Sequence, residues 1–283
     1  MGSPTFKSLI LRNLSFIFRN FFAKSIDNGI LTCYNVPRTN RPLFGFDLSQ
    51  RIYNMNELKT KHLFDLSHTL AAELFLTCEY PWETLSKISE YIIALGKTLP
   101  ADRYDQPSEN VWIAKSTTVS PSASIGAPCI IDEGAEIRQS AFIRGAALVG
   151  AGAVVGNSCE LKNCILFDGV QVPHFNYVGD SILGYKAHMG AGSITSNVKS
   201  DKTNVTLRIG DNRLETGMRK FGAILGDYVE IGCNCVLNPG TVIGRNTSVY
   251  PLTAVRGFIP ADHIVKSGSE VVRKYPKPWK VSD

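Results

Sequence analysis

The sequence predicts an all-β solenoid, a left-handed parallel β-helix of hexapeptide repeats, preceded by a helical N-terminal region. Three observations support this fold. An aliphatic residue recurs every six positions from Ile113 to Leu161, the period resumes from Leu225 to Val255, and the first 110 residues lack it. A period of six matches neither the 3.6 of an α-helix nor the alternation of a simple strand.

Composition narrows the class of protein. The 283 residues carry a net charge of +5, and no dense basic patch with interleaved aromatic residues is present, which argues against nucleic acid and fits a small anionic substrate. The seven cysteines are odd in number and form no C-x-x-C pair. This pattern argues against a disulfide framework or a structural zinc site and favours reduced thiols in the cytoplasm.

The N-terminal stretch "FKSLILRNLSFIFRNFFAKS" is apolar and basic at once. Arg12, Asn13 and Arg19 interrupt it, so it is too short for a spanning helix, and no small-residue cleavage site follows. We expect it to pack against its own chain or a partner subunit. Contact with a membrane surface is the alternative.

The region 1–110 is predicted to be mostly helical. "NELKTKHLFDLSHTLAAELF" has helical character, and "PWETLSKISEYIIALG" is clearer, with Pro81 in its first turn and Gly96 at its end. "LPADRYDQPSENVW" is expected to be a polar linker, and no G-x-G-T-R nucleotide-binding loop is present. The apolar face of the second helix consists of Leu85, Ile88, Ile92 and Leu95.

The β-helix is expected over 111–260, followed by a C-terminal helix or tail over 261–283. Each six-residue unit is a short strand and a turn, and three units make one coil, so residues eighteen apart stack. In the first nine repeats, the residue four positions after the aliphatic one is nearly always small. This slot holds Cys129, Cys159 and Cys235, which we expect to be inert, buried thiols.

After Leu161 the phase of the repeat drops by one, and residues 198–220 then interrupt it altogether. We expect this second feature to be an excursion loop, and loops on rigid scaffolds tend to carry function. After the slip, the aliphatic positions are Leu166, Val172, Val178, Leu183 and Met189.

Arg144 and Lys162 are eighteen residues apart and should stack, with no acidic residue expected between them. Two stacked cations predict an anion site, although a pair of solvated surface cations is the alternative. His174 lies twelve residues beyond Lys162 and could act as a general base there, unless it is only structural.

The stretch "LKNCILFDGVQVPHFNYVGDSILGYKAHMGAGSITSN" resembles the acetyltransferase domain of the bifunctional N-acetylglucosamine-1-phosphate uridyltransferase/glucosamine-1-phosphate acetyltransferases. The resemblance runs from Phe142 to Asn197 and, more loosely, to about Pro260. It implies a homotrimer in which the slip turns His174 toward an intersubunit groove. It also implies that His174 is the general base and Ala191 lies at the acetyl-CoA thioester. The implied sugar-phosphate contacts are Arg144, Lys162, Tyr177 and Asn197.

Three positions depart from the family pattern. His188 replaces an asparagine near the sugar, Cys233 replaces a serine that contacts acetyl-CoA, and Pro251 replaces a small alanine. The nucleotidyltransferase half is also absent, and the unrelated residues 1–110 stand in its place.

The resemblance implies an acetyl-CoA-dependent N-acetyltransferase that acts on an amino-sugar phosphate, glucosamine-1-phosphate above all, in the synthesis of UDP-N-acetylglucosamine and cell-envelope sugars. No metal is needed for this step. The alternatives are a non-catalytic sugar-phosphate-binding or assembly module, an acyltransferase for another amino sugar or acyl group, and a zinc hydratase. The hydratase is the weakest, because His174 and His188 are fourteen residues apart, which is not a multiple of a coil.

Overall fold

The computed structural model describes residues 26–27, 30–31, 55–210, 212–267 and 270–275. The chain divides into two units, Met1–Leu48 and Ser49–Asp283. In the first unit, β1 (Ile26–Asp27) pairs antiparallel with β2 (Ile30–Leu31). The apolar, basic segment 6–25 lies outside the described residues. Within the described part of the chain, no helix has the length and apolar character needed to cross a membrane.

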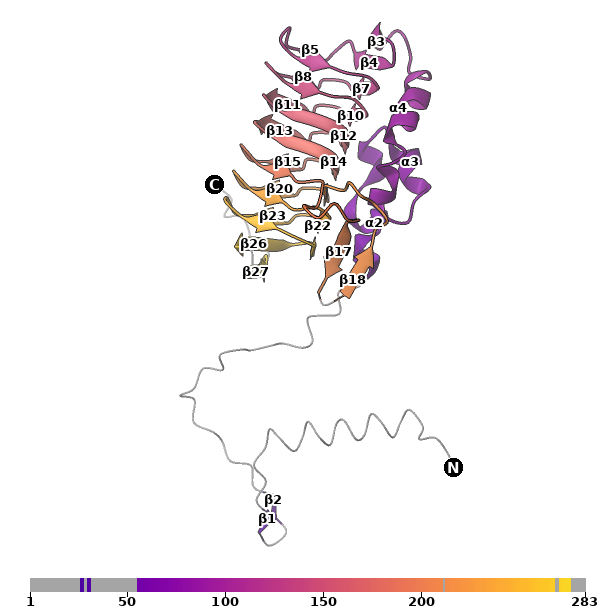
Figure 1. The fold of residues 1–283 in the computed structure, drawn as a ribbon. Coiled ribbons are helices and arrows are strands. Elements are labelled where there is room, and N and C mark those ends of the chain that lie inside the picture. The colour runs from indigo at the N-terminus through magenta and orange to yellow at the C-terminus, as the bar shows by residue number, and fades with distance from the viewer. Residues whose placement is uncertain (1–25, 28–29, 32–54, 211, 268–269, 276–283) are drawn as a thin grey trace, which may run out of the picture. The chain divides into compact units, whose positions relative to one another are not determined.

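The second unit is a parallel β-helix, which confirms the fold predicted from the six-residue period (Figure 1). Short strands stack in parallel along three faces. The first face consists of β4 (Val111–Ala114), β7 (Cys129–Ile131), β10 (Ala147–Val149), the C-terminal halves of β12 (Glu160–Leu166) and β14 (Tyr177–Leu183), β19 (Ala223–Leu225), β22 (Thr241–Ile243) and β25 (Phe258–Ile259).

The other two faces complete each coil. The second face consists of β5 (Thr118–Val119), β8 (Glu136–Ile137), β11 (Val154–Asn157), β13 (Gln171–His174), β15 (His188–Met189), β20 (Glu230–Ile231), β23 (Ser248–Val249) and β26 (His263–Ser267). The third face consists of β6 (Ser124–Ile125), β9 (Phe142–Ile143), the N-terminal halves of β12 and β14, β16 (Ile194–Thr195), β21 (Val236–Leu237) and β24 (Ala254–Val255).

The aliphatic residues of the repeat fill the interior of the coils, as predicted. Those from Ile131 onward are buried, and the first three are partly buried. Burying a side chain of this kind contributes about 1.5–3 kcal/mol. The small-residue slot also behaves as predicted, since Cys129, Cys159 and Cys235 are buried.

The slip in the repeat is absorbed at the corner between the third and first faces. Ala147 pairs with Cys129, eighteen residues away, but also with Cys164, only seventeen away. At this corner β12 and β14 continue from one face to the next without a break. Asn163 and Asp180 make the turns with φ of 50° and 48°, a left-handed conformation that Asn and Asp adopt more readily than most residues.

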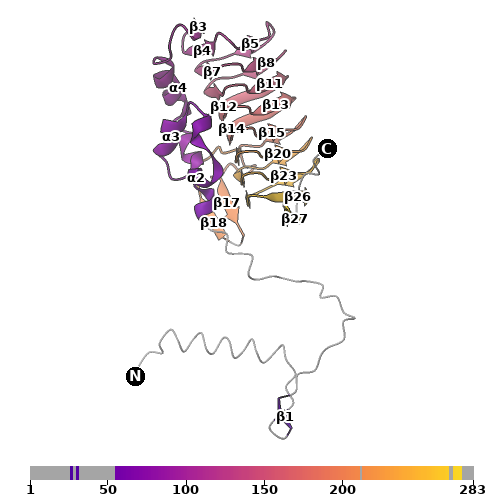
Figure 2. The same ribbon diagram turned by 180° about the vertical axis from the view of Figure 1, so that it is seen from behind.

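Short helices cover the first face, where both views show them beside the strands (Figures 1 and 2). The stretch 56–75 is broken into several short segments instead of the predicted helix. In the second stretch, the helix ends at Gly96, as predicted. The segments are η2 (Met55–Leu58), α2 (Thr60–Leu63), η3 (Leu66–His68), α3 (Ala72–Leu76), η4 (Pro81–Thr84) and α4 (Ile88–Gly96).

The helical cover explains a sequence pattern that the six-residue period does not. On the first face, each inward aliphatic residue is preceded by a second apolar residue that points outward, and α4 contacts β7, β10 and β12. Gly96 is needed because a Cβ atom there would overlap the ring of Trp112. The buried outward residues are Trp112, Ile130, Leu148, Ile165, Ile182, Ile224 and Val242.

A buried carboxylate fastens the helical segment to the β-helix. Asp227 accepts hydrogen bonds from the backbone N–H groups of Asp65 (2.8 Å) and Tyr185 (2.9 Å). Arg245 pairs with the same carboxylate at 3.0 Å, and the Asp227 N–H donates to the carbonyl of Leu63 at 3.0 Å. Burial raises the pKa of Asp227, and these donors oppose that rise by favouring the ionised form.

The excursion 198–220 contains a β-hairpin where a loop was expected. β17 (Thr206–Ile209) pairs antiparallel with β18 (Asn212–Glu215). The chain leaves the coil after Asn197 and returns at Phe221, whose N–H donates to the carbonyl of Asn197 at 3.0 Å. Leu207 and Ile209 are buried, so the hairpin packs firmly against the side of the β-helix.

Two further segments differ from the prediction. The expected polar linker contains β3 (Tyr104–Ser108), which pairs antiparallel with β4 and hydrogen-bonds through the hydroxyl of Tyr104 to Asp132. The expected C-terminal helix or tail contains β27 (Glu270–Arg273), which pairs antiparallel with β26. Both segments use an unpaired edge of the β-helix, which local sequence does not reveal.

The unequal cover of the faces gives a direct test. Leu148 and Phe142 both point outward, but Leu148 is 0% exposed beneath the helices and Phe142 is 46% exposed on the third face. We expect Leu148→Ala to lower the free energy of unfolding by about 2–5 kcal/mol and Phe142→Ala by less than about 1 kcal/mol. Urea denaturation followed by circular dichroism measures both. Equal losses would contradict a protective role for the helical cover.

Candidate functional site

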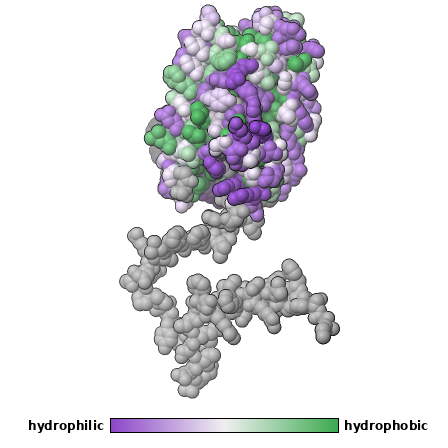
Figure 3. Space-filling view, viewed as in Figure 1, coloured by the Kyte–Doolittle hydropathy of each residue, from purple (hydrophilic) through white to green (hydrophobic). Residues whose placement is uncertain are grey.

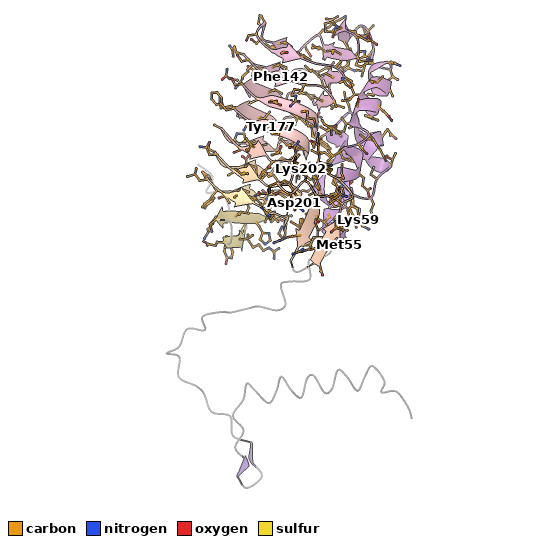
Figure 4. All side chains as sticks on the ribbon, in the orientation of Figure 1. Met55, Lys59, Phe142, Tyr177, Asp201 and Lys202 are labelled. Carbon is orange, nitrogen blue, oxygen red and sulfur yellow. The ribbon has the colours of Figure 1, made fainter. Side chains whose placement is uncertain are left out.

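The outward side chains of the third face form a column on successive coils. Phe142 pairs with Glu160, Glu160 with Tyr177, and Tyr177 with Ile194. Figure 4 labels Phe142 and Tyr177 at different levels of this stack. The ring of Tyr177 lies across Gly179, where any Cβ atom would overlap the phenol oxygen. The glycine therefore lets the tyrosine hydroxyl reach the corner between the third and first faces.

Asp180 organises that corner. Lys162 Nζ lies 3.2 Å from each carboxylate oxygen of Asp180, and Asn163 Nδ2 donates to Oδ1 at 2.8 Å. Asn197 Nδ2 hydrogen-bonds to Oδ2 of Asp180 and lies 3.3 Å from the hydroxyl oxygen of Tyr177. Asp180 is buried. The structure therefore brings together three predicted acceptor ligands, Lys162, Tyr177 and Asn197, around a carboxylate for which no role was predicted.

Arg144 completes this group on the coil before Lys162. Its Nη1 donates to Oε1 of Glu160 at 2.8 Å, and this hydrogen bond raises the pKa of the guanidinium. Each cation has a carboxylate partner that the prediction did not include, because Glu160 pairs with Arg144 and Asp180 with Lys162. The remaining guanidinium N–H groups of Arg144 still face solvent, since its side chain is 46% exposed.

Tyr177 is held in its neutral form. Burial raises the pKa of Tyr177, and the negative charges of Asp180 and Glu160 raise it further. A neutral phenol keeps its O–H proton, so Tyr177 can donate one hydrogen bond to a ligand on the third face while it accepts one from Asn197. The arrangement suits a polar ligand that carries oxygen acceptors. We call Arg144, Lys162, Tyr177 and Asn197 the acceptor group.

Four other predicted residues lie at the opposite edge of the third face, at its corner with the second face. His174 pairs with Asn157 in the strand register. Backbone hydrogen bonds link the turns, from the N–H of Gly192 to His174 O at 3.0 Å and from the N–H of Asn234 to Ala191 O at 2.8 Å. A further bond runs from Leu252 N–H to Cys233 O at 2.9 Å. We call the resulting column, which consists of His174, Ala191, Cys233 and Pro251, the donor column.

The register corrects one expectation about His174. The slip does not turn this residue outward, because the shortened corner lies at Asn163 and Asp180, across the third face. His174 occupies the same column as Asn157 on the coil before it. Its exposure thus follows from a turn that every coil has.

A buried amide fixes the turn that carries His174. Asn176 Oδ1 accepts from the backbone N–H of His174 at 3.1 Å, and Asn176 Nδ2 donates to the carbonyls of Gly190 (2.9 Å) and Ser193 (3.1 Å). Asn176 is buried, and its role was not predicted because a single asparagine in a turn carries no distinctive pattern. Among the described residues, no side chain hydrogen-bonds to the imidazole of His174, which is exposed.

His188 stands apart from both groups. It begins β15 on the second face, and its Nδ1 lies 2.9 Å from Glu230 Oε2. The acceptor group and His174 are also separated within one chain, because they lie at opposite corners of the third face, and the chain turns at Phe175 (φ 52°) before β14 crosses that face. Within the described residues, no three His, Cys, Asp or Glu side chains gather as a set of metal ligands.

Comparison with known proteins places the β-helix among characterised relatives. The family model for the GMPPB C-terminal domain matches residues 125–245. The bifunctional protein GlmU of Methanococcus vannielii is 36% identical over 118 residues, which is 42% of this chain and 28% of that protein. The resemblance predicted from the residues is confirmed.

A second relative has the same bifunctional character. The bifunctional sugar-1-phosphate nucleotidylyltransferase/acetyltransferase of Sulfurisphaera tokodaii is 35% identical over 94 residues, which is 33% of this chain and 23% of that protein. The chain thus spans less than a third of the length of the curated relatives it matches. One similar solved structure is the acetyltransferase domain of PglB from Neisseria gonorrhoeae in complex with acetyl coenzyme A. The match covers 63% of this chain and 60% of that one, with 18% sequence identity and a TM-score of 0.24.

The burial of the thiols predicts one selectively reactive cysteine. Cys233 is exposed in the donor column, whereas Cys129, Cys159, Cys164 and Cys235 are buried. Burial raises the pKa of Cys164 to about 12, which suppresses its reactive thiolate. In a Cys33→Ser, Cys78→Ser background, we expect N-ethylmaleimide to label Cys233 at least about 100-fold faster than the other four.

Peptide mass spectrometry of the folded protein measures these rates, and labelling in denaturant shows that all five thiols can react. Fast labelling of Cys235 or Cys159 in the folded protein would contradict the described packing of the turns.

Proposed function

We propose that this chain is an acyltransferase that moves the acetyl group of acetyl-CoA onto the amine of an amino-sugar phosphate, most simply glucosamine-1-phosphate. The observation that carries the proposal is the placement of the acceptor group and the donor column along the two edges of one face. The names of its GlmU-type relatives, which include an acetyltransferase, support the same reaction.

The acceptor group would hold the phosphate and the sugar. Arg144 has free N–H groups beyond its bond to Glu160, and Lys162 has three donors, of which Asp180 takes only part. A phosphate can bind both cations because Arg offers a planar fork and Lys a compact charge. Asp180 and Glu160 fix the two side chains in place, which lowers the entropy lost on binding.

The transfer itself needs a base and a donor to the oxyanion. The sugar amine attacks the thioester carbonyl, His174 takes a proton from the amine nitrogen, the C–S bond breaks, and the CoA thiolate leaves and takes up a proton. A positioned base of this kind contributes about 10²–10⁴-fold to the rate. The exposed imidazole of His174, which has no side-chain partner among the described residues, is free for this role.

The turn of the donor column at Gly190–Ser193 offers one backbone amide for the oxyanion. The N–H groups of Gly190, Gly192 and Ser193 donate to backbone carbonyls at 2.7, 3.0 and 3.1 Å. The N–H of Ala191 has no acceptor among the described residues and lies next in the column to His174. Ala191 N–H would stabilise the negative charge that develops on the carbonyl oxygen.

A homotrimer would bring the two groups together. Within one chain, His174 and the acceptor group lie at opposite corners of the third face, whereas a base and an acceptor amine must meet within hydrogen-bond reach. In a trimer, the acceptor group of one copy can face the donor column of the next. The same proposal places the protein in the cytoplasm, in UDP-N-acetylglucosamine and cell-envelope sugar synthesis. In this reaction, His188 would line the sugar.

A non-catalytic sugar-phosphate-binding or assembly module is the second candidate. Pro251 packs against Gly232, where a Cβ atom would lie 2.4 Å from the proline nitrogen, and Pro251 has no N–H for a donor molecule. Cys233 is exposed beside it. Loss of CoA binding with retention of sugar-phosphate binding would favour this module.

The first test of the enzyme is release of the CoA thiol from acetyl-CoA in the presence of glucosamine-1-phosphate. We expect His174→Ala to lower kcat by about 10²–10⁴-fold, because the base is lost. His62→Ala is the matched control, since His62 is also exposed but lies in α2, and it should retain full activity. No thiol release by the unsubstituted chain would exclude this substrate pair.

A second test separates phosphate binding from chemistry. Arg144→Ala removes a charge-assisted hydrogen bond worth about 1.5–3 kcal/mol, so KM for the sugar phosphate should rise about 10- to 100-fold. KM for acetyl-CoA should change by less than about twofold. Steady-state kinetics with each substrate varied in turn measures both constants. An equal rise in both would indicate a general loss of structure in place of a lost phosphate contact.

A further inference from the structure

A cavity of about 450 Å³ lies between the excursion and the β-helix. Its walls come from β17 and β18, from the segment 196–201 that leaves the coil, and from Asn238 and Arg256 on neighbouring coils. Figure 3 shows strongly hydrophilic residues gathered over the lower half of the described β-helix unit, the side where Figure 1 places β17 and β18. This cavity, which we call the hairpin pocket, belongs to neither the acceptor group nor the donor column.

Positive charge is concentrated in the hairpin pocket. Arg208 and Arg213 lie directly opposite each other in the hairpin register, and both line the pocket. Arg256 adds a third guanidinium from the β-helix, oriented by a hydrogen bond from its Nη2 to Asn238 Oδ1 at 3.3 Å. Like charges directly opposite in a strand pair destabilise it, so the pairing of two arginines calls for a compensating anion.

The acidic side chains nearby do not supply that anion. Asp201, labelled in Figure 4, lines the pocket but pairs with Lys199 at 3.3 Å. Glu215 accepts from Thr206 Oγ1 at 3.2 Å. No carboxylate among the described residues forms an ion pair with any of the three arginines. The hairpin pocket therefore has three uncompensated positive charges.

The hairpin that carries two of these arginines is firmly placed. Residues alternate along β17, with Leu207 and Ile209 buried against the β-helix and Arg208 turned outward to the pocket. The carbonyl oxygen of Arg208 lies 2.8 Å from where a Cβ atom of Gly257 would be, so the glycine admits the strand. A site on a fixed strand loses little entropy through ordering when a ligand binds.

We propose that the hairpin pocket binds the diphosphate group of a small molecule. Arg binds phosphate through two parallel N–H bonds, and three uncompensated arginines match the charge of a diphosphate better than that of a monophosphate. The hydroxyl groups of Ser196 and Ser200 line the same walls and can donate to phosphate oxygens. The volume fits a small ligand, and no aromatic side chain lines the pocket, so a nucleobase would find no stacking surface.

Two sources could supply this group. The ligand is either a free diphosphate compound or the diphosphate of a nucleotide-linked amino sugar. The second source is considered because Ser196 and Val198 of the pocket flank Asn197 of the acceptor group. The binding site itself does not depend on the proposed acetyl transfer.

Isothermal titration calorimetry of the full chain with inorganic pyrophosphate tests the site. We expect saturable binding at about 0.1 M salt that is at least about 10-fold tighter than orthophosphate binding. Arg213→Gln and Arg256→Gln should each weaken it at least about 10-fold. Arg219→Gln is the matched control, because Arg219 is exposed in the same excursion but does not line the pocket. Thermal melting verifies that each variant is folded.

Absence of pyrophosphate binding would overturn the proposal, and so would equal weakening by Arg219→Gln or equal affinity for orthophosphate. Competition of pyrophosphate with a nucleoside diphosphate and with a nucleoside-diphosphate amino sugar then identifies the source. Stronger competition by the amino sugar supports an acceptor diphosphate, and equal competition supports a free diphosphate ligand. These binding measurements do not require acetyl transfer, so failure of the proposed reaction would leave their outcome unaffected.

Discussion

The parallel backbone ladder is the constraint on which the rest of this structure depends. Each coil must pair with the coils above and below it, so residues seventeen or eighteen apart are forced into columns. A column repeats not only the core residue but also the turn beside it. The donor column exists for this reason, because its members occupy the same turn position on successive coils.

The ladder also limits where residues can be deleted from or inserted into a coil. A one-residue deletion is tolerated at the corner of Asn163 and Asp180, where left-handed turns let β12 and β14 pass directly between faces. A much longer insertion is tolerated only because Phe221 and Asn197 close its base and the hairpin buries its own apolar side chains. Both departures lie at the corner between the third and first faces, and both supply charged groups there.

The helices cover only one of the three faces described here. Helices bury the first face through the outward apolar residues next to each core position, and Asp227 fastens the cover at its edge. Among the described residues, no helix covers the second and third faces. The acceptor group, the donor column and the hairpin pocket all lie at the borders of the third face.

A strict six-residue period and a specific motif are local signals, so the sequence alone predicts the β-helix, its inward aliphatic residues and most of the candidate site residues. Which charges meet depends on the tertiary structure. Asp180 and Glu160 pair with the two cations, Asn176 fixes the turn of His174, and Arg208 faces Arg213 across a hairpin. These contacts join residues by strand register and by side-chain packing, and neither follows from the spacing of residues along the chain.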